Sequence, residues 1–326
     1  MEPHALVTGG AGFIGSHLID QLLAEGARVT VVDNFDPHYD PALKRANLAP
    51  HRGHPRLALH EIDLRDAAAL NRLPGEFDLI VHLAARAGVR TSLADPVGYQ
   101  AANVMGTVHL LEFARRRGIR GFVFGSSSSV YGGCPRLPWR EDDPDLTPLN
   151  PYASSKLAGE HLCRIYAELF GLRVVSLRFF TVFGPRQRPD LAIHKFARLM
   201  LDDQPIPVYG DGSTARDYTY VGDIVAGVCA ALRRVERLPA GHHEIYNLGN
   251  SRTVRLDALI AALEAALRRH AMIERLPEQP GDMHRTWADI GRARRQLGFA
   301  PATDLETGLA RFADWLHAGA GEAAAR

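Results

Sequence analysis

The feature that most limits how this chain can fold is a glycine-rich segment near its N-terminus, Thr8-Gly9-Gly10-Ala11-Gly12-Phe13-Ile14-Gly15. Gly9, Gly12 and Gly15 recur at intervals of three residues, between an apolar run typical of a strand and an amphipathic pattern typical of a helix. Glycine at these places permits a tight turn, lets a diphosphate approach bare backbone, and lets the helix pack against the strand. The segment therefore predicts a dinucleotide-binding turn in a βαβ unit.

A carboxylate stands at the end of the strand expected next. Asp33 closes that apolar run, a position from which it can accept hydrogen bonds from the hydroxyls of an adenosine ribose. Asn34 and Phe35 follow it, and neither carries the positive charge that a 2′-phosphate requires. The pattern therefore favours NAD over NADP. A structural glycine turn that binds no nucleotide is the alternative.

Short apolar runs alternate with longer helical patterns through the first half of the chain. This alternation is typical of a parallel sheet covered by helices on both faces, so the predicted fold class is α/β with a doubly wound Rossmann sheet. Strands are expected at residues 5–8, 28–33, 57–63, 79–84, 122–126 and 174–179. Helices are expected at residues 12–25, 67–73, 99–117 and 152–170, the last two ending at Gly118 and Gly171.

The length of 326 residues suggests two folding units at roughly 150 residues each. After about residue 184, prolines and glycines break the chain into short pieces. We therefore expect an NAD-binding domain over residues 1–184 and a smaller, mainly substrate-binding α/β domain over residues 185–326. A helical pattern at 223–237 and a strand pattern at 241–247 suggest that about residues 223–250 return to the large sheet, which makes the smaller domain discontinuous.

Composition and charge exclude several classes of protein. The chain has 38 Lys and Arg against 37 Asp and Glu, so its net charge near +1 provides no field for holding a nucleic acid. No run approaches the ~18 apolar residues of a membrane span, and the N-terminal pattern is not that of a secretory leader. The three cysteines are far apart and the histidines lack carboxylate companions, so neither disulfides nor a metal site is expected. A cytoplasmic protein is expected.

A tyrosine and a lysine four residues apart, Tyr152 and Lys156, share one face of the helix expected after Pro151. A phenol with an ordinary pKa of about 10 is a poor base at neutral pH, but a neighbouring ammonium and a positive nicotinamide ring would stabilise the phenolate. Ser127 first, and Ser128 second, can share the substrate oxygen with this phenol. We therefore expect Tyr152 to remove a hydroxyl proton as hydride leaves the same carbon. Turn-forming serines and a chance Tyr/Lys spacing are the alternatives.

The glycine segment, Asp33, Ser127, Tyr152 and Lys156 together resemble the extended short-chain dehydrogenase/reductase superfamily, and within it the nucleotide-sugar epimerases. The similarity is greatest to UDP-glucuronate 4-epimerases. Three further segments carry it, residues 33–45, Ala84-Ala85-Arg86-Ala87-Gly88-Val89-Arg90 and Arg178-Phe179-Phe180-Thr181-Val182-Phe183-Gly184-Pro185-Arg186-Gln187-Arg188-Pro189-Asp190. One departure is Arg86, where these epimerases usually have glutamine.

The resemblance implies which residues contact each ligand. For a sugar carboxylate it implies Thr181 and Arg188, since an arginine fork provides both charge and geometry; a surface ion pair is the alternative for Arg188. The other implied substrate contacts are Arg90, Ser127, Ser128, Tyr209, Arg216, Asp282 and Arg285. Candidate NAD contacts, from the patterns and the resemblance together, are Gly9, Gly12, Phe13, Ile14, Gly15, Asp33, Asn34, Asp63, Leu64, Leu83, Ala84, Ala85, Asn103, Tyr152, Lys156 and Phe179.

The activity that the resemblance implies is reversible C4 epimerisation of UDP-glucuronate to UDP-galacturonate, by transient hydride transfer to tightly bound NAD through a 4-keto intermediate. Related dehydratases and decarboxylases carry carboxylic acids where this chain has Ser128 and Ser129. The alternatives are a UDP-glucose or UDP-N-acetylglucosamine 4-epimerase, a net nucleotide-sugar dehydrogenase or reductase, and a non-catalytic NAD-binding protein. The helices at 99–117 and 152–170 are expected to pair across a twofold axis in a homodimer, as in relatives of this family.

Overall fold

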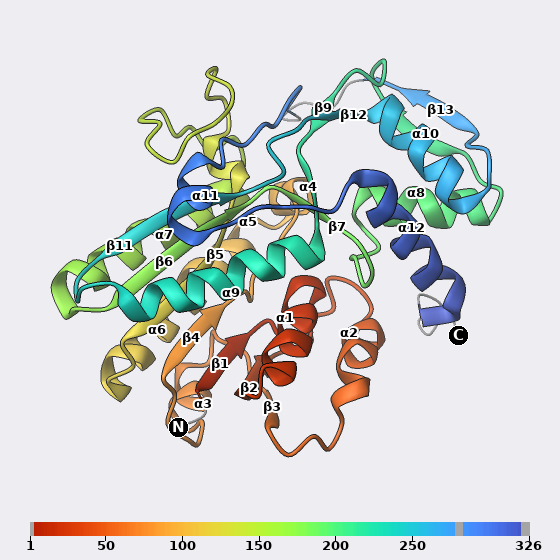
Figure 1. Ribbon diagram of the computed structural model, residues 1–326. Coiled ribbons are helices and arrows are strands. Elements are labelled where there is room, and N and C mark those ends of the chain that lie inside the picture. The colour runs from red at the N-terminus through yellow and green to blue at the C-terminus, as the bar shows by residue number, and fades with distance from the viewer. Residues whose placement is uncertain (1–2, 278–282, 321–326) are drawn as a thin grey trace.

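A computed structural model describes residues 3–277 and 283–320. Its centre is a parallel sheet of seven strands, β1 His4–Thr8, β2 Arg28–Asp33, β3 Leu57–Glu61, β4 Leu79–His82, β5 Gly121–Ser127, β6 Arg173–Phe179 and β11 His243–Leu248 (Figure 1). Their order is β11-β6-β5-β4-β1-β2-β3. Because β1 pairs with both β2 and β4, the strand order reverses beside β1. In an open α/β sheet this reversal creates a crevice at the carboxyl ends of the strands.

Helices cover both faces of this sheet. On one face lie α1 Phe13–Ala24 and α9 Val221–Arg237, and on the other lie α3 Ala67–Asn71, α6 Gly106–Arg117 and α7 Pro151–Phe170. Successive strand residues point to opposite faces, so Val7 packs into the first apolar core and Leu6 into the second. None of the helices within the described residues combines the length and apolar content needed to cross a membrane.

The strands and helices expected in the first half are confirmed, with small shifts at their ends. The helix expected at 99–117 is interrupted, since α5 Pro96–Gln100 leads into a π-helical turn, Ala101–Met105, before α6. Gly118 and Gly171 end α6 and α7 in the left-handed region, with φ of 68° and 73°. The first half also forms α2 Pro41–Leu48 and α4 Val89–Ala94, with 3-10 turns Ala49–His51 and Ser128–Tyr131. Later in the chain, α11 Gly291–Leu297 packs beside β11 and α9.

A smaller unit stands beside the carboxyl ends of the sheet (Figure 1). Its helices are α8 Ala192–Leu201, α10 Leu256–Leu267 and α12 Leu305–Trp315, with a π-helical turn at Leu316–Ala320. Its strands pair as β10 Tyr218–Tyr220 with β7 Thr181–Phe183, β12 Val254–Arg255 with β9 Ala215–Arg216, and β13 Ile273–Leu276 with β8 Ile206–Tyr209. Phe196, Leu263 and Phe312 belong to its own apolar core. The return of α9 and β11 to the large sheet supports a two-domain division near residue 184, which we keep as a proposal.

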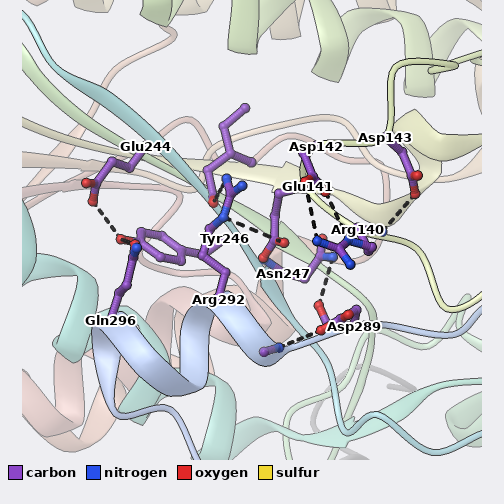
Figure 2. A network of polar contacts seen from close by, with 12 residues as sticks. Arg140, Glu141, Asp142, Asp143, Glu244, Tyr246, Asn247, Asp289, Arg292 and Gln296 are labelled. Carbon is purple, nitrogen blue, oxygen red and sulfur yellow. Dashed lines mark hydrogen bonds and ion pairs between the residues drawn. The ribbon is translucent and has the colours of Figure 1, made fainter.

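A polar network joins the edge strand β11 to the loop before α7 and to the segment before α11 (Figure 2). Glu141 Oε1 accepts a hydrogen bond of 2.9 Å from the Asn247 backbone. The Asn247 amide donates to the backbone oxygens of Trp139 at 2.9 Å and Asp289 at 3.1 Å. The network therefore holds the chain that returns from the smaller unit against the edge of the large sheet.

Candidate active site

A cavity of about 530 Å³ opens at the carboxyl ends of the central strands, where the strand order reverses. The predicted residues that line it are Gly9, Gly12, Phe13, Ile14, Gly15, Asp33, Asn34, Asp63, Leu64, Leu83, Ala84, Ala85, Ser127, Ser128, Tyr152, Lys156, Phe179, Thr181, Arg188 and Arg216. The cavity therefore contains most of the predicted contacts for NAD and for the substrate. Within residues 3–277 and 283–320, no three or more His, Cys, Asp or Glu side chains gather in a way that could hold a metal ion.

The glycine turn leaves its backbone open toward the cavity. Gly12 caps α1 with extended backbone, and among the described residues no side chain makes a cap hydrogen bond there. A Cβ on Gly9 would lie 2.6 Å from the Ala84 nitrogen, and one on Gly15 would lie 2.2 Å from the Gly9 oxygen. Unpaired N–H groups at the positive end of a helix bind phosphate oxygens. The turn therefore fits the diphosphate of NAD.

A Gly15→Ala variant tests this turn. The added Cβ meets backbone atoms that cannot move independently, so we expect the purified variant to retain less than about a tenth of the NAD bound by the unchanged protein. The matched control is Gly118→Ala, at a position with φ of 68° and nothing within 4 Å of the added carbon. It should lose about 1 kcal/mol of stability and keep its NAD. Equal NAD content in both variants would contradict the assignment.

Asp33 is anchored between the glycine turn and the loop after β2. Its Oδ2 accepts from the Ala11 nitrogen at 3.1 Å and its Oδ1 from the Phe35 nitrogen at 2.9 Å. Burial raises the pKa of this carboxyl, and the Phe35 N–H and the Lys44 ammonium oppose that rise. Lys44 also lines the cavity and was not predicted, because a single lysine in a helical pattern carries no signal in the sequence. The result is a fixed acceptor at the end of β2.

Asp63 lies just beyond the end of β3. A salt bridge of 2.6 Å joins it to Arg65, and the Asn34 amide donates to its Oδ2 at 3.0 Å. Hydrogen bonds from Arg65 hold the pKa of Asp63 at about 2, against the opposing effect of burial. The carboxyl is therefore ionised at neutral pH and linked to the residue after Asp33.

Tyr152 is placed by the cap of α7. Asn150 Oδ1 accepts from the Ala153 nitrogen at 2.9 Å, and Pro151 occupies the first helical position. Burial raises the pKa of the Tyr152 phenol, whereas a hydrogen bond with the Ser127 hydroxyl and the charge of Arg188 lower it. Ser127 and Tyr152, predicted from separate patterns, are thus in contact. Asn150 also lines the cavity, and its signal in the sequence was the Asn-Pro pair that begins the helix.

Lys156 lies one turn further along α7 and faces the end of β5. Its ammonium donates to the Gly125 oxygen at 2.7 Å. Burial lowers the pKa of Lys156 to about 8, while Cys163 and Glu160 oppose that fall. Among the described residues, the cation found to lower the pKa of Tyr152 is Arg188. The effect of Lys156 on the phenol therefore remains a proposal.

Thr181, the first residue of β7, and Arg188, in the loop after β7, both line the cavity. The Thr181 backbone nitrogen donates to the Asp217 backbone oxygen at 3.0 Å. The Arg188 guanidinium, whose side chain is 17% exposed, forks onto Asp190 with bonds of 2.9 and 2.7 Å, and it also donates to the Ala87 oxygen at 3.3 Å. Arg188 therefore comes to the cavity wall in a fixed orientation.

The other predicted substrate contacts are more scattered. The Arg90 guanidinium lies 4.4 Å from the centre of the Tyr209 ring, so these two are brought together, but neither lines the cavity. Arg285 is exposed and forms a backbone bridge to Ala215, the residue before Arg216. Asp282 lies outside the described residues. Of those predicted contacts that the structure describes, only Arg216 is among the residues that line the cavity.

Asn103 differs from the other predicted NAD contacts, because it is buried and does not line the cavity. Its amide binds the Arg86 nitrogen and oxygen at 2.8 and 2.9 Å and the Ser155 hydroxyl at 2.9 Å. Thr286, which was not predicted, does line the cavity, and its hydroxyl accepts from the Asp217 nitrogen at 3.1 Å. The sequence around Thr286 contains no local pattern that predicts this contact.

Comparisons with known proteins agree with this geometry. The model of the NAD dependent epimerase/dehydratase family matches residues 5–249. A UDP-glucuronate 4-epimerase of Thermodesulfobacterium geofontis is 39% identical over 313 residues, 95% of each chain. The crystal structure of UDP-glucuronic acid 4-epimerase from Bacillus cereus with UDP-glucuronic acid and NAD superposes with a TM-score of 0.88 at 37% identity, covering 97% of this chain and 99% of that one. A dTDP-glucose 4,6-dehydratase from Streptomyces venezuelae gives 0.90 at 34% identity, covering 98% of each.

The doubly wound sheet and its open glycine turn define an NAD-dependent enzyme. Ser127 and Tyr152 lie on the wall of the cavity that this turn opens into. The chain belongs to the NAD dependent epimerase/dehydratase family.

Proposed function

We propose that this NAD-dependent nucleotide-sugar 4-epimerase interconverts UDP-glucuronate and UDP-galacturonate. The observation that carries the choice of sugar is the position of Arg188, a guanidinium on the wall of the same cavity as Ser127 and Tyr152 and near enough to lower the pKa of the Tyr152 phenol. A cation there is suited to a sugar that bears a carboxylate close to its reacting carbon. The relatives named as UDP-glucuronate 4-epimerases support this choice.

The predicted catalytic and NAD-binding residues of the cavity each have a proposed task. The Tyr152 phenolate oxygen takes the proton of the sugar 4-hydroxyl and later returns it, while the Ser127 hydroxyl orients the same sugar oxygen. Lys156 stabilises the phenolate and helps to hold the cofactor, and the glycine turn with Asp33 binds the diphosphate and the adenosine ribose. Bound NAD supplies a reversible acceptor for the hydride on C4. No net oxidation of the sugar results.

Thr181 and Arg188 are proposed to hold the sugar carboxylate. The fork on Asp190 keeps the guanidinium plane in place, so little side-chain freedom is lost when an anion binds. A uronic acid oxidised at C4 is a β-keto acid that can lose CO2, and a firmly oriented carboxylate discourages that loss. Among the described lining residues the carboxylates are Asp33, Asp36 and Asp63, so the Ser127–Ser129 segment offers no acid for a dehydration.

A comparison of substrates tests the choice of sugar. We expect kcat/KM for UDP-glucuronate to exceed the values for UDP-glucose and UDP-N-acetylglucosamine by at least about tenfold, since hydrogen bonds to a charged group contribute about 1.5–3 kcal/mol. A larger value for a neutral sugar would favour the alternative epimerases. Release of NADH into solution would identify a net dehydrogenase.

We also propose that the protein is a homodimer that pairs through α5, α6 and α7. Tyr166 on α7 donates to Glu112 on α6 at 2.8 Å, so the two helices lie side by side. Val97 on α5 and Leu169 on α7 leave large apolar side chains exposed. Light scattering should give twice the chain mass of 35.8 kDa, and Leu169→Glu should shift the protein toward half that value. Met272→Glu, at an exposed apolar residue of the smaller unit, is the control. A monomeric unchanged protein would contradict the proposal.

A further inference from the structure

A buried ion pair lies behind the cavity and outside its lining. Glu160 on α7 and Arg178 on β6 are 3% and 1% exposed. The guanidinium forks onto the carboxylate, with Nε–Oε1 of 2.9 Å and Nη2–Oε2 of 2.7 Å. Neither residue is among those that line the cavity. The pair is therefore not placed to touch the sugar or the cofactor.

Both members of the pair contact the segment that carries Ser127. The Ser126 hydroxyl donates to Glu160 Oε1 at 2.5 Å. The Arg178 guanidinium lies 4.7 Å from the centre of the Tyr131 ring, and the Tyr131 hydroxyl donates to Asn247 on β11 at 2.7 Å. Ser126 directly precedes Ser127, and Tyr131 is the last residue of the 3-10 turn that follows it. The ion pair thus holds both ends of the turn that presents the Ser127 hydroxyl.

The same pair continues the attachment of α7 to β5. Residues four apart share a helix face, so Lys156 and Glu160 face the sheet on successive turns, below Tyr152. Lys156 binds the Gly125 oxygen and Glu160 binds the Ser126 hydroxyl, which are neighbouring residues at the end of β5. The distance between the helix that carries Tyr152 and the strand that carries Ser127 is therefore set at two successive turns.

A buried ion pair is a weak source of net stability. Taking both ions out of water costs so much that well-packed apolar residues of similar size often replace such a pair without loss. What the fork adds is a defined geometry. We propose that Glu160 and Arg178 are positioning residues that keep the Ser127 hydroxyl in place against the Tyr152 phenol. This inference rests on the proposed function, because it assumes that these two side chains share the substrate oxygen.

Three variants test the positioning role. Glu160→Gln removes the charge, Arg178→Lys keeps a charge but loses the fork, and the double variant Glu160→Met with Arg178→Met removes both buried ions together. A displacement of about 1 Å costs a reaction roughly a hundredfold. We therefore expect kcat to fall 10- to 100-fold in each, with KM within threefold and NAD content unchanged. The double variant should keep its melting temperature within a few degrees, since it removes both members of the ion pair together.

The chain provides a control pair with the same fork geometry at a partly exposed place. Arg234 on α9 forks onto Glu244 on β11 with bonds of 2.8 and 2.6 Å, and the two side chains are 33% and 24% exposed. The Tyr246 hydroxyl donates to the same carboxylate (Figure 2). Replacing both by methionine should leave kcat within twofold. A folded Glu160 or Arg178 variant with kcat within twofold of the unchanged protein would overturn the inference. An equal loss of kcat in the control pair would overturn it as well.

The two proposals fail in different ways. If the unchanged protein does not convert UDP-glucuronate, the choice of sugar is wrong, and the same variants are then compared with the UDP-sugar that it does convert. If the unchanged protein converts UDP-glucuronate and the Glu160 and Arg178 variants do so at the native rate, the positioning role alone is wrong.

Discussion

Tyr152→Phe is expected to lower kcat by about 10²- to 10⁴-fold, the contribution typical of a positioned proton acceptor. Phenylalanine keeps the ring on the cavity wall and removes the one oxygen that contacts Ser127. Because the glycine turn is untouched, the variant should be purified with the same amount of NAD. Turnover of UDP-sugar and NAD released on denaturation are the two measurements.

The control for this variant is Tyr99→Phe. Tyr99 is buried, its ring centre lies 6.4 Å from that of Tyr152, and its hydroxyl bonds to Thr91 instead of pointing into the cavity. Its loss should change kcat by less than about fivefold, because it removes one neutral hydrogen bond of about 1 kcal/mol. A Tyr152→Phe variant that turns over at nearly the native rate would refute the proton-transfer assignment.

Arg188→Ala is expected to reduce kcat/KM for UDP-glucuronate by about 30- to 100-fold, the equivalent of about 2–3 kcal/mol for a lost charged hydrogen bond. The kcat/KM for UDP-glucose should change by less than about fivefold, because this sugar has no carboxylate. Arg186→Ala is the control: it lies on the same loop, pairs with Asp20 at 2.8 Å and is not among the lining residues. Equal losses with both sugars would count against carboxylate recognition.

Removal of Arg188 should also move the pH profile. Burial raises the pKa of the Tyr152 phenol, and the guanidinium works in the opposite direction. Without that cation the phenol pKa rises, so the rise of kcat with pH should shift to higher pH for either sugar. The two sugars are therefore compared at the pH at which each protein reaches its plateau. An unshifted profile would show that Arg188 does not act on the phenol.

Local patterns were sufficient for the parts of the site that follow from chain geometry. The glycine turn, Asp33 and the Tyr152–Lys156 pair each depend on spacing within one strand–turn–helix unit, and such spacing is visible in the sequence. Parallel strands then bring their carboxyl ends to one edge, which gathers these residues without further information.

Contacts that depend on long-range packing could not be predicted in this way. Asn103 sits in a π-helical turn that rotates its amide into the protein, where Arg86 and Ser155 bind it, and regular helical spacing gives no sign of such a turn. Likewise Arg178 appears in the sequence only as a charge within an apolar strand. Its carboxylate partner is Glu160, and the two meet only because α7 packs on β5 and β6, which the sequence does not show.

The proposed conversion uses a resident NAD to invert C4 of UDP-glucuronate without net oxidation. It is tested most directly by incubating the purified protein with UDP-glucuronate, with no cofactor added, and following the nucleotide sugars by proton NMR. We predict that UDP-galacturonate appears while no NADH is released. Formation of a UDP-pentose, or an unchanged UDP-glucuronate spectrum from a protein that carries NAD, would contradict the claim.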